Sequence, residues 1–329
     1  MIPRGRLASI CLALITLAAC GGRQSALNPQ GPEALRLTQL GWLLFALGAG
    51  ILVLVVLATA VAVRGPDRLR TLLASARTVI WAGVVFPVTT LTLLLGYGIW
   101  LTRGGGIALD DPAALRVTVV GEQWWWRVVY QHRGTAVATA NEIRIPVGRP
   151  LLFVLTSADV IHSFWVPNLG GKVDMIPGRT THLRLRADQP GVFRGQCAEY
   201  CGGSHALMAL EVISLSEPEF ESWLEDQARP AAEPATTEAR RGQELFVAAG
   251  CGGCHTVRGT PATGTVGPDL THLGSRRSVG LDTLPMTEAN IRRFIRDGQH
   301  VKPGNPMPPF RIFSQADLGA IAAYLAGLQ

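Results

Sequence analysis

The chain has 329 residues, enough for two globular units and a membrane anchor. Its net charge of +6 is the sum of +7 in residues 1–103, −4 in residues 104–226, −1 in residues 227–239 and +4 in residues 240–329. Because the positive surplus is divided between an apolar segment and one terminal unit, the charge disfavours a nucleic-acid partner, and we expect none.

Residues 1–19 have the pattern of an export signal. Arg4 and Arg6 supply a positive start, an apolar core too short to span a bilayer comfortably follows, and small residues precede Cys20. Leu17-Ala-Ala-Cys20 resembles a bacterial lipobox, which predicts a lipoprotein whose mature chain begins at a lipidated Cys20. A plain cleavage site and an uncleaved leader are the alternatives.

Two long apolar stretches follow within residues 20–103. Residues 37–63 and 79–101 contain no charged side chain, and each exceeds the roughly 20 residues that a helix needs to cross a bilayer. Pro87 is expected to kink the second span. The short loop between the spans is rich in arginine and should stay in the cytoplasm. Both termini and everything from about Gly104 onward would then lie on the outer side of a bacterial inner membrane.

Residues 104–226 are predicted to form a β domain. Short runs rich in β-branched and aromatic residues are separated by glycine, proline and aspartate, which is typical of a sandwich or barrel. The predicted strands are residues 116–120, 125–130, 142–146, 151–156, 181–186 and 210–213. Residues 217–226 are expected to form a brief closing helix.

Residues 227–239 have the composition of a linker, and residues 240–329 are predicted to be a helical domain. Helices are expected over residues 238–249 and over residues 287–297, with Gly298 as a stop. Ser314 and Asp317 form a capping-box arrangement at the start of the last helix. The apolar face predicted for that helix consists of Leu318, Ile321, Ala322 and Leu325.

Two thiols, an imidazole and a thioether fall within twelve residues, at Cys197, Cys201, His205 and Met208. Soft sulfur ligands beside imidazole favour copper, and two thiolates can bridge two metal ions where one cannot. His162 is the expected second imidazole, because the end loops of a barrel can meet in space. A structural zinc site and a disulfide with an incidental histidine are the alternatives.

Cys251-Gly-Gly-Cys254-His255 matches C-x-x-C-H, the attachment signature of a c-type haem. This spacing lets both thiols reach the vinyl groups while the histidine faces the iron, and a redox disulfide is the alternative. As the sixth iron ligand we prefer Met307, in an extended proline-rich loop, to Met286, which directly precedes a helix.

The terminal domain, residues 238–329, resembles a class I cytochrome c. The resemblance includes Gly267-Pro268-Asp269-Leu270, a segment that in the family packs near the proximal histidine. His272 and His300 are expected to be surface residues, not iron ligands.

Residues 37–226 resemble cytochrome c oxidase subunit II, in Gly121 to Trp126, Asp159 to Asn168, Lys172 to Arg179 and Gly195 to Met208. The resemblance implies a two-helix transmembrane hairpin, then an all-β cupredoxin-like barrel, here followed by the all-α cytochrome. It also implies a binuclear Cu-A centre. The residues that carry over as copper ligands are Cys197 and Cys201 (bridging), His162, His205, Met208 and the main-chain carbonyl of Glu199.

The family pattern assigns two further roles. The Glu199 side chain would reach a magnesium or manganese ion at the border with subunit I. Trp124, the first of three adjacent tryptophans, would lie near the surface as the residue through which electrons enter, although core packing explains at least one of the three. Many family members carry histidine where this chain has Glu122, and this departure affects the expected docking surface.

The order of leader, hairpin, copper barrel, linker and cytochrome resembles subunit II of caa3-type haem–copper oxidases. This implies electron flow from an external donor, such as a cytochrome c or the bc complex, through haem c and Cu-A to haem a in subunit I. Subunit I would hold haem a3 and Cu-B, reduce oxygen to water and translocate protons, with subunit III as a further partner.

Three other classes of protein share part of this pattern. A Cu-A nitric oxide reductase subunit would share the copper motif and hairpin. A quinol oxidase subunit II lacks the copper ligands, and a copper-delivery lipoprotein would not need a covalent haem.

Overall fold

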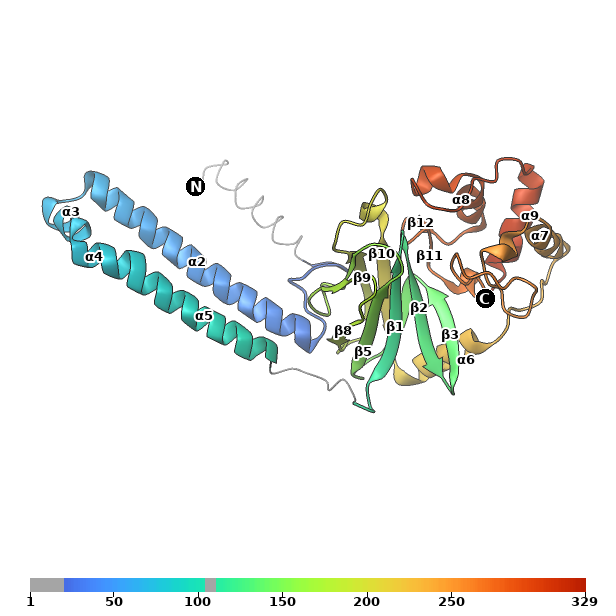
Figure 1. The fold of residues 1–329 in the computed structure, drawn as a ribbon, viewed down its shortest axis with the longest axis horizontal. Helices are drawn as coiled ribbons and strands as arrows, with labels where there is room; N and C mark the ends of the chain where they lie inside the picture. Colours follow the sequence, from blue (N-terminus) through green and yellow to red (C-terminus); the bar gives the residue numbers. More distant parts are fainter. Residues whose placement is uncertain (1–20, 104–110) are drawn as a thin grey trace, which may run out of the picture.

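The structure, a computed structural model, describes residues 21–103 and 111–329. The predicted leader, Cys20 and the position of Gly104 lie outside the described residues. A helical hairpin, a β-sandwich and a small helical domain follow one another along the molecule (Figure 1).

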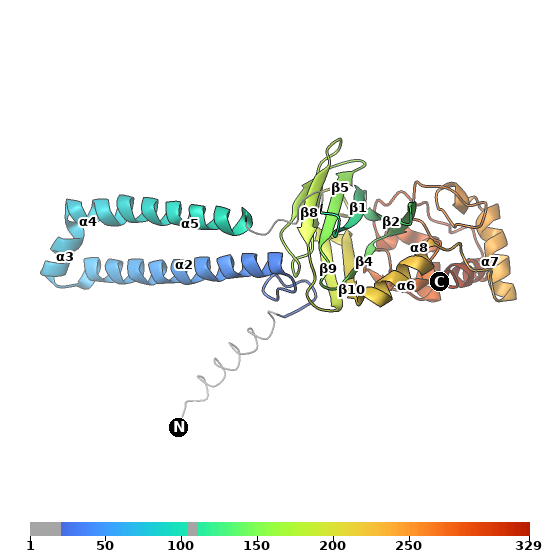
Figure 2. The ribbon, with the colours of Figure 1, turned by 90° about the horizontal axis from the view of Figure 1, so that it is seen from below.

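The hairpin consists of helices in which most of the large apolar side chains are exposed. Its elements are α2 (Pro32–Arg64), α3 (Asp67–Ala74), α4 (Ala76–Ile80), a π-helical segment (Trp81–Val85) and α5 (Phe86–Arg103). Pro32–Arg64 and Ala76–Leu101 are each long and apolar enough to cross a membrane, and no part of their most apolar stretches is buried. The two long arms run side by side (Figure 2).

Two details of the hairpin differ from the sequence expectation. α2 begins at Pro32, ahead of the span predicted from residue 37, because proline suits the first helical position and the preceding chain is bound to the sandwich. There the Gln30 amide donates to the Asn168 carbonyl at 2.7 Å. The irregularity expected at Pro87 takes the form of the π-helical segment just before it. A wider turn relieves the clash between the proline ring and the carbonyl four residues earlier.

Within the described residues, ten strands form two five-stranded sheets, ordered β3-β2-β1-β5-β8 and β4-β10-β9-β6-β7. The first five strands are β1 (Leu115–Glu122), β2 (Trp125–His132), β3 (Thr135–Ala140), β4 (Glu142–Pro146) and β5 (Leu151–Ser157). The others are β6 (His162–Trp165), β7 (Val173–Met175), β8 (Thr181–Leu185), β9 (Gly191–Cys197) and β10 (Ala209–Leu215). The pairs β1–β5 and β4–β10 are parallel, and the core between the sheets includes the buried Trp126, Phe153 and Phe164.

The predicted β domain is confirmed, but four of its strands were missed by the sequence prediction: β3, β6, β7 and β9. β6 and β7 are very short, and β9 contains Gly191 and Gly195, which weaken a strand signal. Pairing stabilises them, because β9 lies between β10 and β6 in the sheet. The prediction therefore missed the two strands on which most of the sulfur site is built.

The C-terminal domain packs its helices around a second core that includes Phe246, Ile291 and Leu318. The sandwich closes with α6 (Glu217–Ala228). The helices and strands of the C-terminal domain are α7 (Thr237–Ala248), β11 (Ser278–Val279), β12 (Leu284–Pro285), α8 (Glu288–Val301) and α9 (Gln315–Ala326). The side chain of Ser314 caps α9 by accepting from the Asp317 amide at 3.1 Å. The whole predicted apolar face of α9 is buried.

α8 does not end at Gly298 as expected. Its regular backbone breaks at Asp297, where φ is −153° and ψ is 64°, and one further turn runs to Val301. The amide of Lys302 closes this turn on the Gly298 carbonyl at 2.8 Å. The extra turn carries the chain to the loop that contains Met307.

The linker expected between the two domains is bound to the C-terminal domain. The Ala231 amide donates to the Arg258 carbonyl at 2.9 Å, and His272 Nε2 lies 3.1 Å from the Arg229 carbonyl oxygen. His272 is only 5% exposed, so its expected surface position is wrong, because the linker covers it. His300 is exposed, as predicted.

Two glycines in α7 and α9 make a matched test of this helix packing. A Cβ on Gly242 would lie 1.9 Å from the Ala320 carbonyl oxygen, whereas a Cβ on Gly319 would find its nearest atom at 3.6 Å. We expect Gly242→Ala to destabilise the domain by about 1–3 kcal/mol through overpacking. Gly319→Ala should stabilise it by roughly 0.5–1 kcal/mol through helix propensity. Calorimetry of the full chain would measure both, and equal shifts would contradict this packing.

Candidate copper and haem sites

Three segments of the sandwich bring the predicted sulfur and imidazole ligands together. His162 begins β6, Cys197 ends β9, and Cys201 lies in the loop that follows. Because β6 and β9 pair with Phe164 opposite Cys197, the His162 ring comes close to Cys197, with Nδ1 and Sγ 3.8 Å apart. These three side chains form a buried cluster of potential metal ligands.

The two sulfur atoms are unbonded and lie 3.7 Å apart. Around Cys197 Sγ, the Glu199 carbonyl oxygen is 3.2 Å away, in addition to the His162 ring. Around Cys201 Sγ, His205 Nδ1 is 3.5 Å away and Met208 Sδ is 3.8 Å away. The structure thus brings all six predicted donors to one place, and each sulfur has an imidazole of its own.

The His162 ring is oriented by a carboxylate behind it. Asp159 Oδ1 lies 2.8 Å from His162 Nε2, so this nitrogen donates to the carboxylate, and Nδ1 presents its lone pair to the sulfur cluster. Gly121 on β1 packs closely against the His162 ring, since a Cβ at that position would lie 2.7 Å from the ring carbon Cδ2. The motif residue Asp159 therefore has a structural role that the sequence analysis did not assign.

The two thiols influence each other's ionisation because their sulfur atoms are in contact. The contact with the Cys201 thiol lowers the pKa of Cys197 to about 3, and the same contact raises the pKa of Cys201 above its ordinary value. Both side chains are buried, as are His162 and Met208. A metal ion binds cysteine as the thiolate, so binding through both sulfurs requires both thiols to lose their protons.

Trp124 packs directly on the sulfur loop. Its indole Nε1 donates to the Cys201 carbonyl at 2.9 Å, and the Gln123 side chain donates to the same carbonyl at 2.7 Å. Trp124 is only 9% exposed, so the expected position near the surface is wrong for this chain. The reason is that Lys302 and Gly304 of the C-terminal domain lie against it.

The other tryptophans of the triplet pack within the sandwich. Trp126 is fully buried, donates to the Ala209 carbonyl at 3.0 Å and meets the Phe164 ring edge-on. The Arg127 guanidinium lies over the Trp125 ring, 4.8 Å from its centroid. Core packing accounts for Trp126, whereas Trp124 precedes β2 and connects the sulfur loop to the C-terminal domain.

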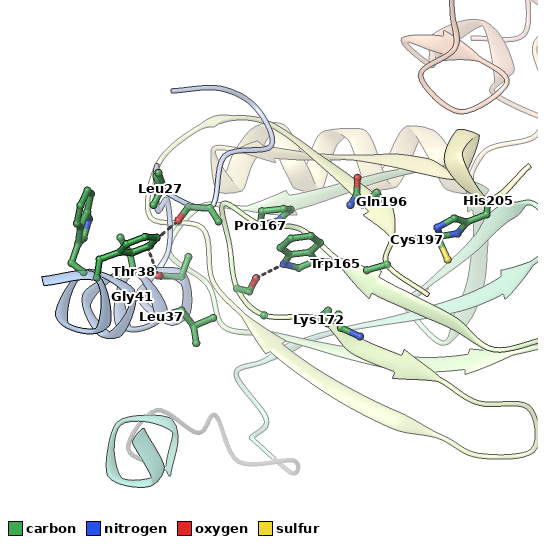
Figure 3. A pocket seen from close by; sticks show the side chains of 17 residues that line it. Leu27, Leu37, Thr38, Gly41, Trp165, Pro167, Lys172, Gln196, Cys197 and His205 are labelled. Carbon is green, nitrogen blue, oxygen red and sulfur yellow. Dashed lines mark hydrogen bonds between the residues drawn. The ribbon is translucent and has the colours of Figure 1, made fainter. Parts of the chain in front are cut away.

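A groove of about 690 Å³ runs between the N-terminal end of α2 and the sandwich. Its walls include the apolar side chains of Leu37, Trp42 and Trp165, and it extends to Cys197 and His205 (Figure 3). His205 is half-buried, in contrast to His162. The sulfur cluster is therefore approachable along the side from which the hairpin leaves the sandwich.

The C-x-x-C-H segment follows α7 through a sharp turn. Gly250 has a φ of +74°, a left-handed conformation suited to glycine, and Cys251–Gly253 then form a 3₁₀ turn. His255 Nδ1 lies 2.8 Å from the Pro268 carbonyl oxygen, so it donates there and leaves Nε2 free for a metal. Burial lowers the pKa of His255, which favours the neutral, ligating form.

The segment Gly267-Pro268 holds the His255 ring closely. A Cβ on Gly267 would lie 2.5 Å from the ring carbon Cε1, so only glycine fits without displacing the ring. The Gly267 amide also donates to the Cys254 carbonyl at 2.8 Å. The packing that the resemblance implied near the proximal histidine is therefore present.

Both candidate sixth ligands are half-buried. Met286 and Met307, like Cys251, pack against the second core. The loop of Met307 is ordered by hydrogen bonds, because its amide donates to Asn305 Oδ1 at 3.0 Å and Gln299 donates to its carbonyl at 3.3 Å. The preference for Met307 stays a prediction.

Comparisons with known proteins agree with this division of the chain. Residues 133–215 match the family model described as cytochrome c oxidase subunit II, periplasmic domain, and residues 239–329 match that of cytochrome c. Cytochrome c oxidase subunit 2 of Alkalihalophilus pseudofirmus is 41% identical over 220 residues, which are 67% of this chain and 62% of that protein. The chain thus spans a little under two thirds of this relative's length.

Two further similarities extend the comparison. The periplasmic domain of subunit II of cytochrome oxidase from Bradyrhizobium japonicum is 34% identical, with 35% of this chain and 94% of that chain covered and a TM-score of 0.33. Cytochrome c oxidase subunit 2 of Bacillus subtilis is 31% identical over 256 residues, which cover 75% of this chain and 70% of that protein. The chain therefore belongs to the cytochrome c oxidase subunit 2 family, with a cytochrome c domain at its C-terminal end.

Proposed function

We propose that this chain is the electron-transferring subunit II of a caa3-type cytochrome c oxidase. In this proposal the C-terminal domain takes electrons from an external donor and passes them to a binuclear Cu-A centre in the sandwich. Haem a of subunit I accepts them next, and oxygen is reduced to water there. The observation that carries the proposal is the pair of buried, unbonded thiols 3.7 Å apart, each beside its own imidazole.

The donor set fits copper better than it fits zinc. Thiolate, imidazole and thioether ligands suit copper, whereas thioether is a poor partner for zinc. Cys197 and Cys201 would bridge the two ions, and His162 and His205 would each bind one. Met208 and the Glu199 carbonyl would complete the ligand set. Met208 Sδ lies 3.8 Å from Cys201 Sγ, and the Glu199 carbonyl oxygen lies 3.2 Å from Cys197 Sγ.

The C-terminal domain fits a covalent haem. Cys251 and Cys254 would carry the two thioether links, and His255, already oriented by the Pro268 carbonyl, would bind the iron. Met307 would supply the sixth ligand from its ordered loop. When bound, the haem iron and the coppers supply one-electron redox chemistry, and this chain positions and insulates them.

The membrane anchor and the groove support the proposed partners. The two spans and the periplasmic family domain fit a membrane-anchored subunit. With the arginine-rich loop in the cytoplasm, both outer domains and both termini lie on the periplasmic side. We assign the groove that reaches Cys197 and His205 to subunit I, with Glu199 contributing to a magnesium or manganese site at that border. Subunit III, the donor and proton translocation follow from the family resemblance, whereas a lipidated Cys20 follows from the resemblance of Leu17-Ala-Ala-Cys20 to a lipobox.

Metal analysis tests the copper assignment directly. The matured full chain should contain two copper ions and one haem per chain, with an EPR spectrum in which one electron is shared by both coppers. Cys201→Ser should abolish the shared spectrum, because a single thiolate cannot hold two ions symmetrically. A single copper, a zinc ion or no metal in the wild-type chain would refute the assignment.

The substrate consumed by the purified complex distinguishes a cytochrome c oxidase from a Cu-A nitric oxide reductase. Purified complex should consume oxygen with reduced donor, and nitric oxide consumption without oxygen uptake would point to a nitric oxide reductase instead.

The carboxylate behind His162 should tune copper binding. Asp159→Ala removes the acceptor that orients the ring, and we expect copper affinity to fall about 10–100-fold, as for other outer-shell partners. Asp188→Ala is the matched control, because Asp188 is exposed and pairs with Arg186 on the surface. Competition with a copper chelator measures both affinities, and equal affinities would contradict the proposed role of Asp159.

The sixth iron ligand can be identified by a pair of substitutions. Met307→Leu should lower the haem reduction potential and convert the ferric iron to high spin, because His/Met ligation raises the potential. Met286→Leu should leave the spectrum and potential unchanged. Absorption spectra with a redox titration give both readouts. A change in the Met286 variant alone would transfer the assignment to Met286.

A further inference from the structure

A loop of the C-terminal domain, residues 302–307, lies against the sulfur site of the sandwich. The Lys302 ammonium group is buried between the domains and donates to the main-chain carbonyl of Trp124. The neighbouring Pro303 carbonyl accepts from the buried Ser204 hydroxyl at 2.6 Å. Gly304 lies over the indole, since a Cβ there would be 3.1 Å from the Trp124 ring.

This loop connects the two proposed redox sites through a short series of bonded groups. Asn305 links its two ends, because its side chain donates to the Lys302 carbonyl at 2.7 Å and accepts from the Met307 amide at 3.0 Å. On the other side, Trp124 donates to the Cys201 carbonyl, and Ser204 directly precedes His205. The segment that carries a candidate iron ligand is thus bound to the segment that carries two candidate copper ligands.

A second contact comes from the turn between β11 and β12, residues 280–283. Leu281 inserts into the sandwich and joins its hydrophobic core, although it belongs to the C-terminal domain. Its backbone is left-handed, with a φ of +65°, and so is that of Asp282, with a φ of +59°. Such conformations cost energy in residues other than glycine and persist where surrounding contacts enforce them. Here these contacts include the ion pair of Asp282 with Arg194 at 2.8 Å.

A third contact supplies hydrogen-bond donors to two buried carboxyl groups. Glu142 on β4 and Glu211 on β10 lie opposite each other in the sheet. Arg277 of the C-terminal domain reaches both, through its amide to Glu142 at 2.5 Å and its guanidinium to Glu211 at 3.0 Å. Without that domain Glu211, which also pairs with Arg23, would lose one of its cationic partners, and Glu142 would lose an amide donor, and both losses are unfavourable for buried groups.

The unusual Glu122 belongs to the same interface. Arg127 Nε donates to Glu122 Oε1 at 2.7 Å. Nη2 of the same guanidinium donates to the Thr265 carbonyl of the C-terminal domain at 2.6 Å. The departure from the family pattern thus lies where the two domains touch.

We propose that the cytochrome domain is held on the sandwich in this one orientation, with Lys302 as the positioning residue that seats the 302–307 loop on Trp124. The face at Trp124 is then closed to external donors, which must deliver electrons to the cytochrome domain instead. This inference rests on the proposed function. In the transfer step one electron leaves the ferrous iron, which becomes ferric, and reduces the copper centre by one electron, with no bond or proton exchanged.

The lysine content of the chain offers a direct test of the interface. Lys172 and Lys302 are its only lysines, so amine acetylation followed by peptide mass spectrometry reports on both at once. The Lys172 side chain is 47% exposed and serves as the internal control, whereas Lys302 is 3% exposed. In the matured full chain we expect Lys302 to react at least about tenfold more slowly than Lys172. Equal rates would overturn the fixed interface.

A matched pair of substitutions checks that the protection of Lys302 comes from this interface. Leu281→Ala removes the side chain that anchors the 280–283 turn and should raise the acetylation rate of Lys302 severalfold. Ile312→Ala changes a residue of the same domain that is 90% exposed and should leave that rate unchanged. If Lys302 stays equally protected in the Leu281 variant, the 280–283 turn does not hold the domain and the proposed interface is wrong.

Electron transfer tests the positioning role of Lys302. After photoreduction of the haem with a soluble ruthenium sensitiser, Lys302→Met should slow reduction of the copper centre about tenfold, because the Trp124 carbonyl loses its donor. The rate should also become dependent on ionic strength, since docking becomes a separate step. Ile312→Ala, at a residue of the same domain that is 90% exposed, should behave as wild type. An unchanged rate in the Lys302 variant would remove its positioning role.

The proposed function and the fixed interface can be refuted independently of each other. Absence of copper or haem from the matured chain refutes the proposed function and can be measured without any variant. Acetylation of Lys302 at the rate of Lys172, in a chain that contains both cofactors, refutes the fixed interface alone.

Discussion

The pairing of β6 with β9 is the constraint on which the copper site depends. It places His162 beside Cys197, and it does so at the end of β9, where the chain can turn back and present Cys201. Because side chains alternate along a strand, a shift of one residue in this register would send Cys197 to the opposite face. The neighbouring Trp126 and Phe164 rings fill the space behind the site and make such a shift costly.

The same end of the sandwich also receives the cytochrome domain. Trp124 is bonded on one side to the sulfur loop and on the other to Lys302, so this residue joins the sulfur loop to the 302–307 loop of the cytochrome domain. Across the interface, the buried Glu211 and Ser204 make hydrogen bonds to the cytochrome domain, and Leu281 packs into the core of the sandwich. The contact therefore resembles a domain core more than the loose meeting of two tethered units.

Several elements could be predicted from the sequence because their determinants are local. The spans follow from long uncharged runs, the start of α9 from Ser314 and Asp317, and the candidate ligands from cysteine, histidine and methionine at short spacing. The prediction failed where long-range contacts override local preference. β6 and β9 are too short or too rich in glycine to be recognised alone, and His272 is buried only because the linker folds over it.

By itself the sequence determined the chemistry of this protein: which donor atoms are available, which stretches can cross a membrane and in what order the domains follow. Only the tertiary structure decided which nitrogen of His162 faces the sulfurs, and that Trp124 is covered by the chain's own cytochrome domain. The physical reason is the range of the interactions. Ligand spacing and hydropathy are properties of neighbouring residues, whereas Lys302 and Trp124 lie 178 positions apart and meet only when both domains are folded.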